Sequence, residues 1–63
     1  MREKWTGEAV KLMHIHNISQ TELAIHINKS REWVCKILNG IEKPLNAQSI
    51  IESAINEIIE ERS

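Results

Sequence analysis

The sequence is poor in the residues that stabilise small secreted proteins or form linkers. It has one cysteine, Cys35, whereas small secreted domains usually rely on several disulfides. Two glycines and one proline exclude a collagen-like or linker-like chain. No apolar run approaches the roughly 20 residues that cross a bilayer, and no signal-peptide pattern is visible. We therefore expect a cytoplasmic protein with no membrane partner.

A length of 63 residues leaves room for one domain, which we expect to span residues 1–63. Such a chain offers little material for a walled catalytic pocket and its supporting shell. His14 and His16 lie two apart and would point about 200° apart on a helix, so they cannot share a metal ion. His26 and Cys35 fall on different expected helices, and no metal-ligand spacing connects them. We therefore expect a binding protein, not an enzyme, with no metal and no cofactor.

The net charge of −1 hides a difference between two parts of the chain. Residues 1–44 carry seven Lys or Arg against five Glu, giving +2. Residues 45–63 carry one Arg against four Glu, giving −3. The first part is therefore suited to a polyanionic partner, and the second part is not.

Apolar residues recur at spacings of three and four, which predicts an all-α chain of four helices. The expected N-caps are Thr6, Ser19, Ser30 and Asn46. The expected stops are Asn17, Asn28 and the pair Asn39–Gly40, and the last helix is expected to end near Glu61. Ser19 and Glu22 match a capping box. Hydrophobic staples are expected for Trp5 with Val10, for Ile18 with Leu23 and for Leu45 with Ile50.

The segment 46–61 has an unusually wide apolar face. Its isoleucines and Ala54 cover an arc of roughly 180°, whereas docking on a small core needs only about 100°. Either the helix lies in a deep groove of the monomer, or its surplus apolar surface contacts a partner. We favour the partner and expect this helix to serve both core packing and dimerisation. The expected dimer contacts are Ile51, Ile55, Ile58 and Ile59.

Only Asn28, Lys29 and Ser30 separate the second and third expected helices. So short a break forces a steep crossing, which is the helix-turn-helix geometry that places its second helix in a DNA major groove. The outer face of that helix is expected to carry Arg31, Glu32, Cys35, Lys36 and Asn39. Arg31 suits guanine, and Asn39 suits a phosphate or a base edge. Glu32 either accepts a hydrogen bond from cytosine or pairs with Lys36.

Residues 18–24 (ISQTELA), 30–34 (SREWV) and 37–40 (ILNG) resemble the phage-repressor-like (lambda repressor/Cro, XRE-type) helix-turn-helix family. The similarity covers roughly residues 9–45. It implies a compact bundle of four or five helices that binds operator DNA, commonly as a dimer. The DNA-contacting positions that it implies are Gln20, Ser30, Arg31, Glu32, Cys35, Lys36 and Asn39, with Trp33 packed at the turn beside the DNA backbone. Lys29 and Lys43 are added as basic residues of the same surface.

The expected function is therefore that of a sequence-specific double-stranded DNA-binding transcriptional regulator of bacterial or phage type. A homodimer would present two recognition helices, each about residues 31–39, one DNA turn or about 34 Å apart. Because so short a chain has no room for a sensor domain, control is expected through protein concentration, a regulatory protein partner or competition for sites. The alternative is a protein-interaction module, an antirepressor or adaptor. The weak net charge and the apolar surplus of residues 46–61 favour that alternative.

Overall fold

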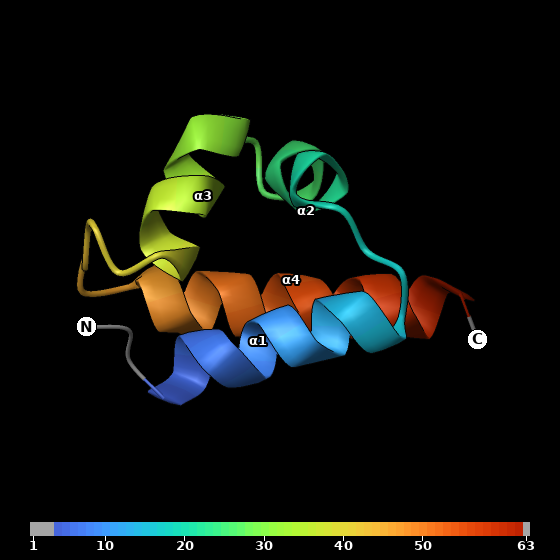
Figure 1. Cartoon of the computed structure of the whole chain (residues 1–63). Helices are drawn as coiled ribbons and strands as arrows, with labels where there is room; N and C mark the ends of the chain where they lie inside the picture. Colours follow the sequence, from blue (N-terminus) through green and yellow to red (C-terminus); the bar gives the residue numbers. More distant parts are fainter. Residues whose placement is uncertain (1–3, 63) are drawn as a thin grey trace.

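The computed structural model describes residues 4–62, which form four helices and no strand. The helices are α1 (Lys4–Ile15), α2 (Gln20–His26), α3 (Arg31–Leu38) and α4 (Ala47–Arg62). Figure 1 shows α1 and α4 side by side as one layer, with α2 and α3 packed on the same side of this pair. The all-helical prediction is confirmed. Within the described range no helix has the length and apolar character needed to span a membrane.

Local signals fix the ends of the first three helices. The hydroxyls of Ser19 and Ser30 each accept a 3.0 Å hydrogen bond from the backbone N–H three residues later. Positive φ angles of 58°, 58° and 75° occur at Asn17, Asn28 and Gly40, as predicted. In each case the following residue donates its N–H to a carbonyl five positions earlier. This is the Schellman arrangement, and it satisfies carbonyls that a helix end leaves without partners.

The predictions for the first helix start and for the Trp5–Val10 and Leu45–Ile50 staples are wrong. α1 begins at Lys4, so Thr6 is inside the helix and is 2% exposed instead of capping it. Val10 is 37% exposed while Trp5 packs against the core, so these two side chains do not form a staple. Leu45 is fully exposed and does not cover Ile50. Burial of Thr6 in the core outweighs its local preference for a cap position.

One core cluster joins the four helices. Its members, all nearly inaccessible to solvent, are Ala9, Met13, Ile18, Leu23, Ala24, Val34, Ile37, Leu38, Ala47, Ile51, Ala54, Ile55 and Ile58. Both α1 and α2 contact α4, so the wide apolar arc of α4 lies in a groove of the monomer. The assignment of Ile51, Ile55 and Ile58 to a dimer interface is therefore wrong. Ile59 is partly buried against the same core and keeps some exposed surface.

Polar contacts tie the C-terminal half of α4 to the other helices. The guanidinium of Arg62 donates from Nη2 to both carboxylate oxygens of Glu22, at 2.5 and 2.6 Å. Its Nη1 donates to the backbone carbonyl of His16. Nε2 of His26 lies 2.8 Å from Oε1 of Glu57. Glu22 therefore binds the last turn of α4, a contact that its capping-box role did not predict.

Replacing Arg62 with alanine is expected to lower the free energy of unfolding by about 1 kcal/mol. The value is modest because the side chains of Arg62 and Glu22 are each 40% exposed, so solvent screens the pair. Urea unfolding followed by circular dichroism measures the change. Glu61→Ala is the control, since this exposed residue lies beside Arg62 in the same helical turn. Equal stability of Arg62→Ala and the wild type would show that the bidentate contact contributes nothing.

Candidate nucleic-acid interface

The turn between α2 and α3 sets the relative orientation of these two helices. Four residues, 27–30, separate them. Asn28 has a positive φ, and the N–H of Lys29 donates to the carbonyl of Ala24 at 2.9 Å. Ser30 then caps α3. The chain thus changes direction sharply, and Figure 1 shows α2 nearly end-on while α3 is seen from the side.

Small and branched apolar side chains close the inner side of this helix pair. Ala24 on α2 is buried, and α2 packs against α3. Val34 and Ile37 on α3 are buried as well, together with Leu38. The predicted inner face is confirmed. Three of the eight residues of α3 are buried in the core. Their burial fixes the rotation of the helix about its axis, and so determines which side chains point outward.

The opposite side of α3 forms a polar strip. Glu32, Lys36 and Asn39 are exposed, and Cys35 is half-buried at its edge. Arg31 is exposed in the first turn of the helix. The structure thus brings together all five predicted outer-face residues. No ion pair of Arg31 occurs within residues 4–62.

Two side chains of the strip have partners that the sequence did not predict. The Nδ2 group of Asn39 donates to the carbonyl of Cys35 at 2.8 Å and to its Sγ at 3.2 Å. Nζ of Lys36 lies 3.9 Å from Oε1 of Glu42, in the segment after α3. Lys36 thus pairs with Glu42 and not with Glu32. Both members of this pair are about half exposed, so it is weak and can exchange for another anion.

Lys29 and Trp33 form a cation–π contact at the beginning of α3. The ammonium nitrogen of Lys29 lies 5.3 Å from the centroid of the indole ring. Trp33 is partly buried against the core. The contact places a positive charge beside the start of α3 and close in sequence to Arg31. It also gives Lys29 a preferred direction, which a free lysine side chain would lack.

The remaining predicted residues lie around the ends of α2 and α3. Gln20 is the first residue of α2 and is half-buried. The oxygen of Ser30 accepts the cap hydrogen bond, which leaves its O–H able to donate. Lys43 lies in the segment between α3 and α4 and is exposed. Residues 28–44 carry four Lys or Arg against two Glu, so this segment has an excess of two positive charges.

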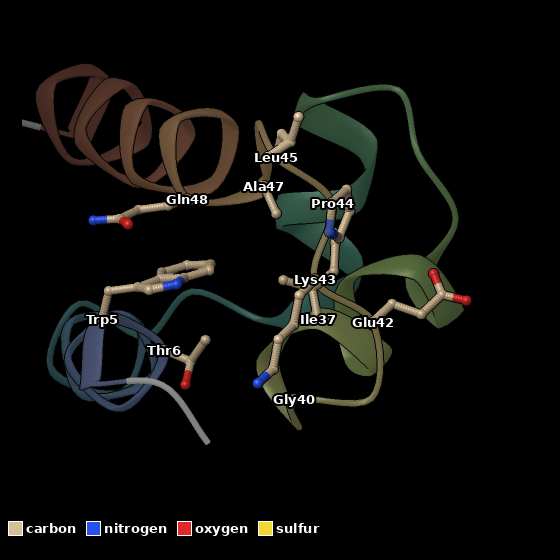
Figure 2. A pocket seen from close by; sticks show the side chains of 10 residues that line it. All are labelled: Trp5, Thr6, Ile37, Gly40, Glu42, Lys43, Pro44, Leu45, Ala47 and Gln48. Atoms are coloured by element: carbon tan, nitrogen blue, oxygen red, sulfur yellow. The ribbon is translucent and has the colours of Figure 1, made fainter. Parts of the chain in front are cut away.

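A hollow of about 210 Å³ lies next to the end of α3 and was not predicted from the sequence. The N-terminal part of α1, the end of α3, the following segment and the start of α4 surround it. Figure 2 shows Trp5 and Gln48 on one side of it, with Pro44 and Lys43 on the other. Leu45 stands at its rim and is fully exposed. In the sequence, the one sign of this hollow was the aliphatic residue Leu45 directly after Pro44.

No group of three or more His, Cys, Asp or Glu side chains in residues 4–62 is arranged to bind a metal ion. Comparisons of the chain with protein-family models, with curated proteins and with solved structures gave no match. Inference about function therefore depends on the residues and geometry of the α2–α3 unit.

Proposed function

We propose that this protein is a sequence-specific double-stranded DNA-binding transcriptional regulator of the lambda repressor/Cro, XRE-type helix-turn-helix kind. In this proposal α2 and α3 are the helix-turn-helix and α3 is the recognition helix. The observation that supports it most is the polar strip of α3, held outward by an apolar inner face behind a sharp turn. The excess of positive charge on residues 28–44 adds to this support.

The dimensions of α3 suit the DNA major groove. Its eight residues give a length of about 12 Å at 1.5 Å per residue. An α-helix with its side chains is about 10–12 Å in diameter, and the groove is about 12 Å wide. A short helix whose outer face is exposed can therefore enter the groove while α2 remains near the backbone.

The side chains of this surface divide into base contacts and phosphate contacts. Arg31 has the planar pair of donors that binds O6 and N7 of guanine, and Lys36 and Asn39 follow along the strip. Lys29, Ser30, Gln20 and Lys43 lie at the ends of the two helices, where phosphates would pass. Glu42 holds Lys36 only weakly, so a phosphate or a base edge can replace it.

A protein-interaction module is the second candidate function. Exposed aliphatic side chains support it, because a DNA-binding surface does not need them: Ile15, Ile25, Ile41 and Leu45. Such a module would form a stable complex with another protein. It would bind DNA without sequence preference, or would not bind it at all.

Selection from random double-stranded DNA tests the proposed function. The wild type is expected to enrich a two-fold symmetric sequence. Arg31→Ala is expected to lose about 10- to 100-fold in affinity and to relax one position of each half-site, because one bidentate base contact contributes about 1–3 kcal/mol. Arg31 is exposed, so this variant should fold normally.

Lys11→Ala provides the matched control. Lys11 is also exposed, but it lies on α1, away from the polar strip of α3. Its removal subtracts one positive charge and should leave the selected sequence unchanged. If the wild type enriches no sequence at low salt, the DNA-binding proposal is wrong and the protein-interaction module takes its place.

A further inference from the structure

Glu42 is held beside Lys36 by the backbone as well as by charge. Gly40, with a φ of 75°, turns the chain back at the end of α3. As a result the N–H groups of Ile41 and Glu42 both donate to the carbonyl of Lys36, at 2.8 and 3.4 Å. Oε1 of Glu42 lies 3.9 Å from Nζ of Lys36. The residue with the carboxylate is therefore anchored to the residue with the ammonium.

The polar strip of α3 and Glu42 together are electrically balanced. Arg31 and Lys36 carry two positive charges, and Glu32 and Glu42 carry two negative charges, all on exposed side chains. Attraction to phosphates supplies nearly all of the affinity of a DNA-binding protein for unrelated sequences. A balanced surface adds little to that attraction. Phosphate binding is then left to basic residues outside the strip, such as Lys29.

Lys36 can turn from Glu42 to two kinds of DNA acceptor, with different consequences for the carboxylate. A phosphate is an anion, so its binding at Lys36 brings a second negative charge close to Glu42. O6 and N7 of guanine are uncharged acceptors, so no such repulsion arises. The ammonium has three N–H donors, which is enough for a base edge and the carboxylate together. Glu42 therefore opposes phosphate binding at Lys36 and is compatible with a base contact.

We propose that Glu42 is a specificity-determining residue of the α3 surface, which withholds Lys36 from the phosphates of unrelated DNA. Specificity is a difference between two affinities, and repulsion of the wrong partner increases it. Both side chains of the pair are half exposed, so the effect is moderate, about fivefold in affinity. The inference deepens the proposed function and rests on it, since discrimination between duplexes requires sequence-specific binding.

Fluorescence anisotropy with two labelled duplexes, one selected and one unrelated, tests the role of Glu42. Glu42→Gln removes the charge and keeps the size and the backbone N–H. Its affinity for the unrelated duplex is expected to rise about fivefold, with a salt slope steeper by about one unit per subunit, because Lys36 then neutralises a phosphate. Its affinity for the selected duplex should change by less than about twofold, so the ratio of the two affinities falls. Circular dichroism should show unchanged helix content at this exposed position.

Two further measurements separate the role of Glu42 from the effect of charge in general. Glu8→Gln removes the same charge from an exposed position on α1 and should leave the ratio of affinities unchanged. Glu42→Gln is also made in a Lys36→Ala background. There it should change the affinity for the unrelated duplex by at most about twofold, because the lysine that it would release is absent.

The results for Glu42 and for the proposed function can be distinguished. A wild type that selects no DNA sequence removes both. A wild type that selects a sequence, with an unchanged ratio of affinities in Glu42→Gln, overturns the role of Glu42 alone. A fall in the ratio that Glu8→Gln reproduces, or that persists in the Lys36→Ala background, also overturns that role and leaves DNA binding in place.

Discussion

Replacing Ile51 with alanine is expected to lower the free energy of unfolding by about 2–4 kcal/mol. Ile51 is fully buried on α4, which contacts both α1 and α2. The substitution removes apolar contacts and leaves a cavity that a small core cannot readily close. A domain of this size rarely has more than about 3–5 kcal/mol of stability, so a large fraction of the variant should be unfolded at 25 °C. Urea and thermal unfolding followed by circular dichroism measure the effect.

Ile59→Ala is the matched control for Ile51→Ala. It makes the same change on the same helix, at a position only partly buried against the core. We expect a loss of about 1 kcal/mol or less. The two variants thus compare a core position with a peripheral one. If Ile51→Ala kept the stability of the monomer but weakened association between copies, Ile51 would belong to an interface and the described core would be wrong.

The sequence predicted helix ends where the signals are local. Ser19 and Ser30 accept hydrogen bonds from N–H groups three residues away, so a few neighbouring residues determine the result. Asn17 and Asn28 tolerate positive φ for an equally local reason. Thr6 was misassigned because burial in the core, which depends on the other helices, overrides its cap preference. Local patterns contain no information about that burial.

The role of α4 depended on contacts that its own sequence does not contain. The width of its apolar arc was evident, but whether other helices or another copy of the chain cover that arc is a question of tertiary packing. α1 and α2 cover it, so Ile55 and Ile58 lie in the monomer core. The contact of Arg62 with Glu22 joins residues 40 positions apart, so the spacing of apolar residues could not predict it either.

Some features of the candidate site could also be predicted from the sequence, and others could not. Helical spacing placed Glu32, Lys36 and Asn39 on one outward strip, because the rotation per residue is fixed once α3 is assigned. The pairing of Lys36 with Glu42 and the hollow beside Leu45 both involve residues 39–46, between α3 and α4. This segment has no repeating geometry, so the chain's three-dimensional path was needed to find them.

DNA affinity is expected to fall steeply as salt concentration rises. If each subunit of a dimer neutralises about three phosphates, the slope of log affinity against log salt is about −5. Affinity should then drop about 10³-fold between 50 and 200 mM salt. The expected phosphate ligands lie around α2 and α3, whereas residues 45–63 carry a charge of −3 and would be repelled. Fluorescence anisotropy with a labelled selected duplex measures the slope.

In the same titration, variants of single basic residues distinguish phosphate neutralisation from base-specific contact. Lys29→Ala is expected to reduce the slope by about one unit per subunit, because this exposed lysine is one of the proposed phosphate contacts. Its weakened binding should then be uniform across duplex sequences. Arg31→Ala should instead lose most affinity on the selected duplex and little on an unrelated one, because a base contact discriminates. Lys11→Ala should keep the wild-type slope. A wild-type slope near zero would contradict DNA binding by the α3 surface, whatever its specificity.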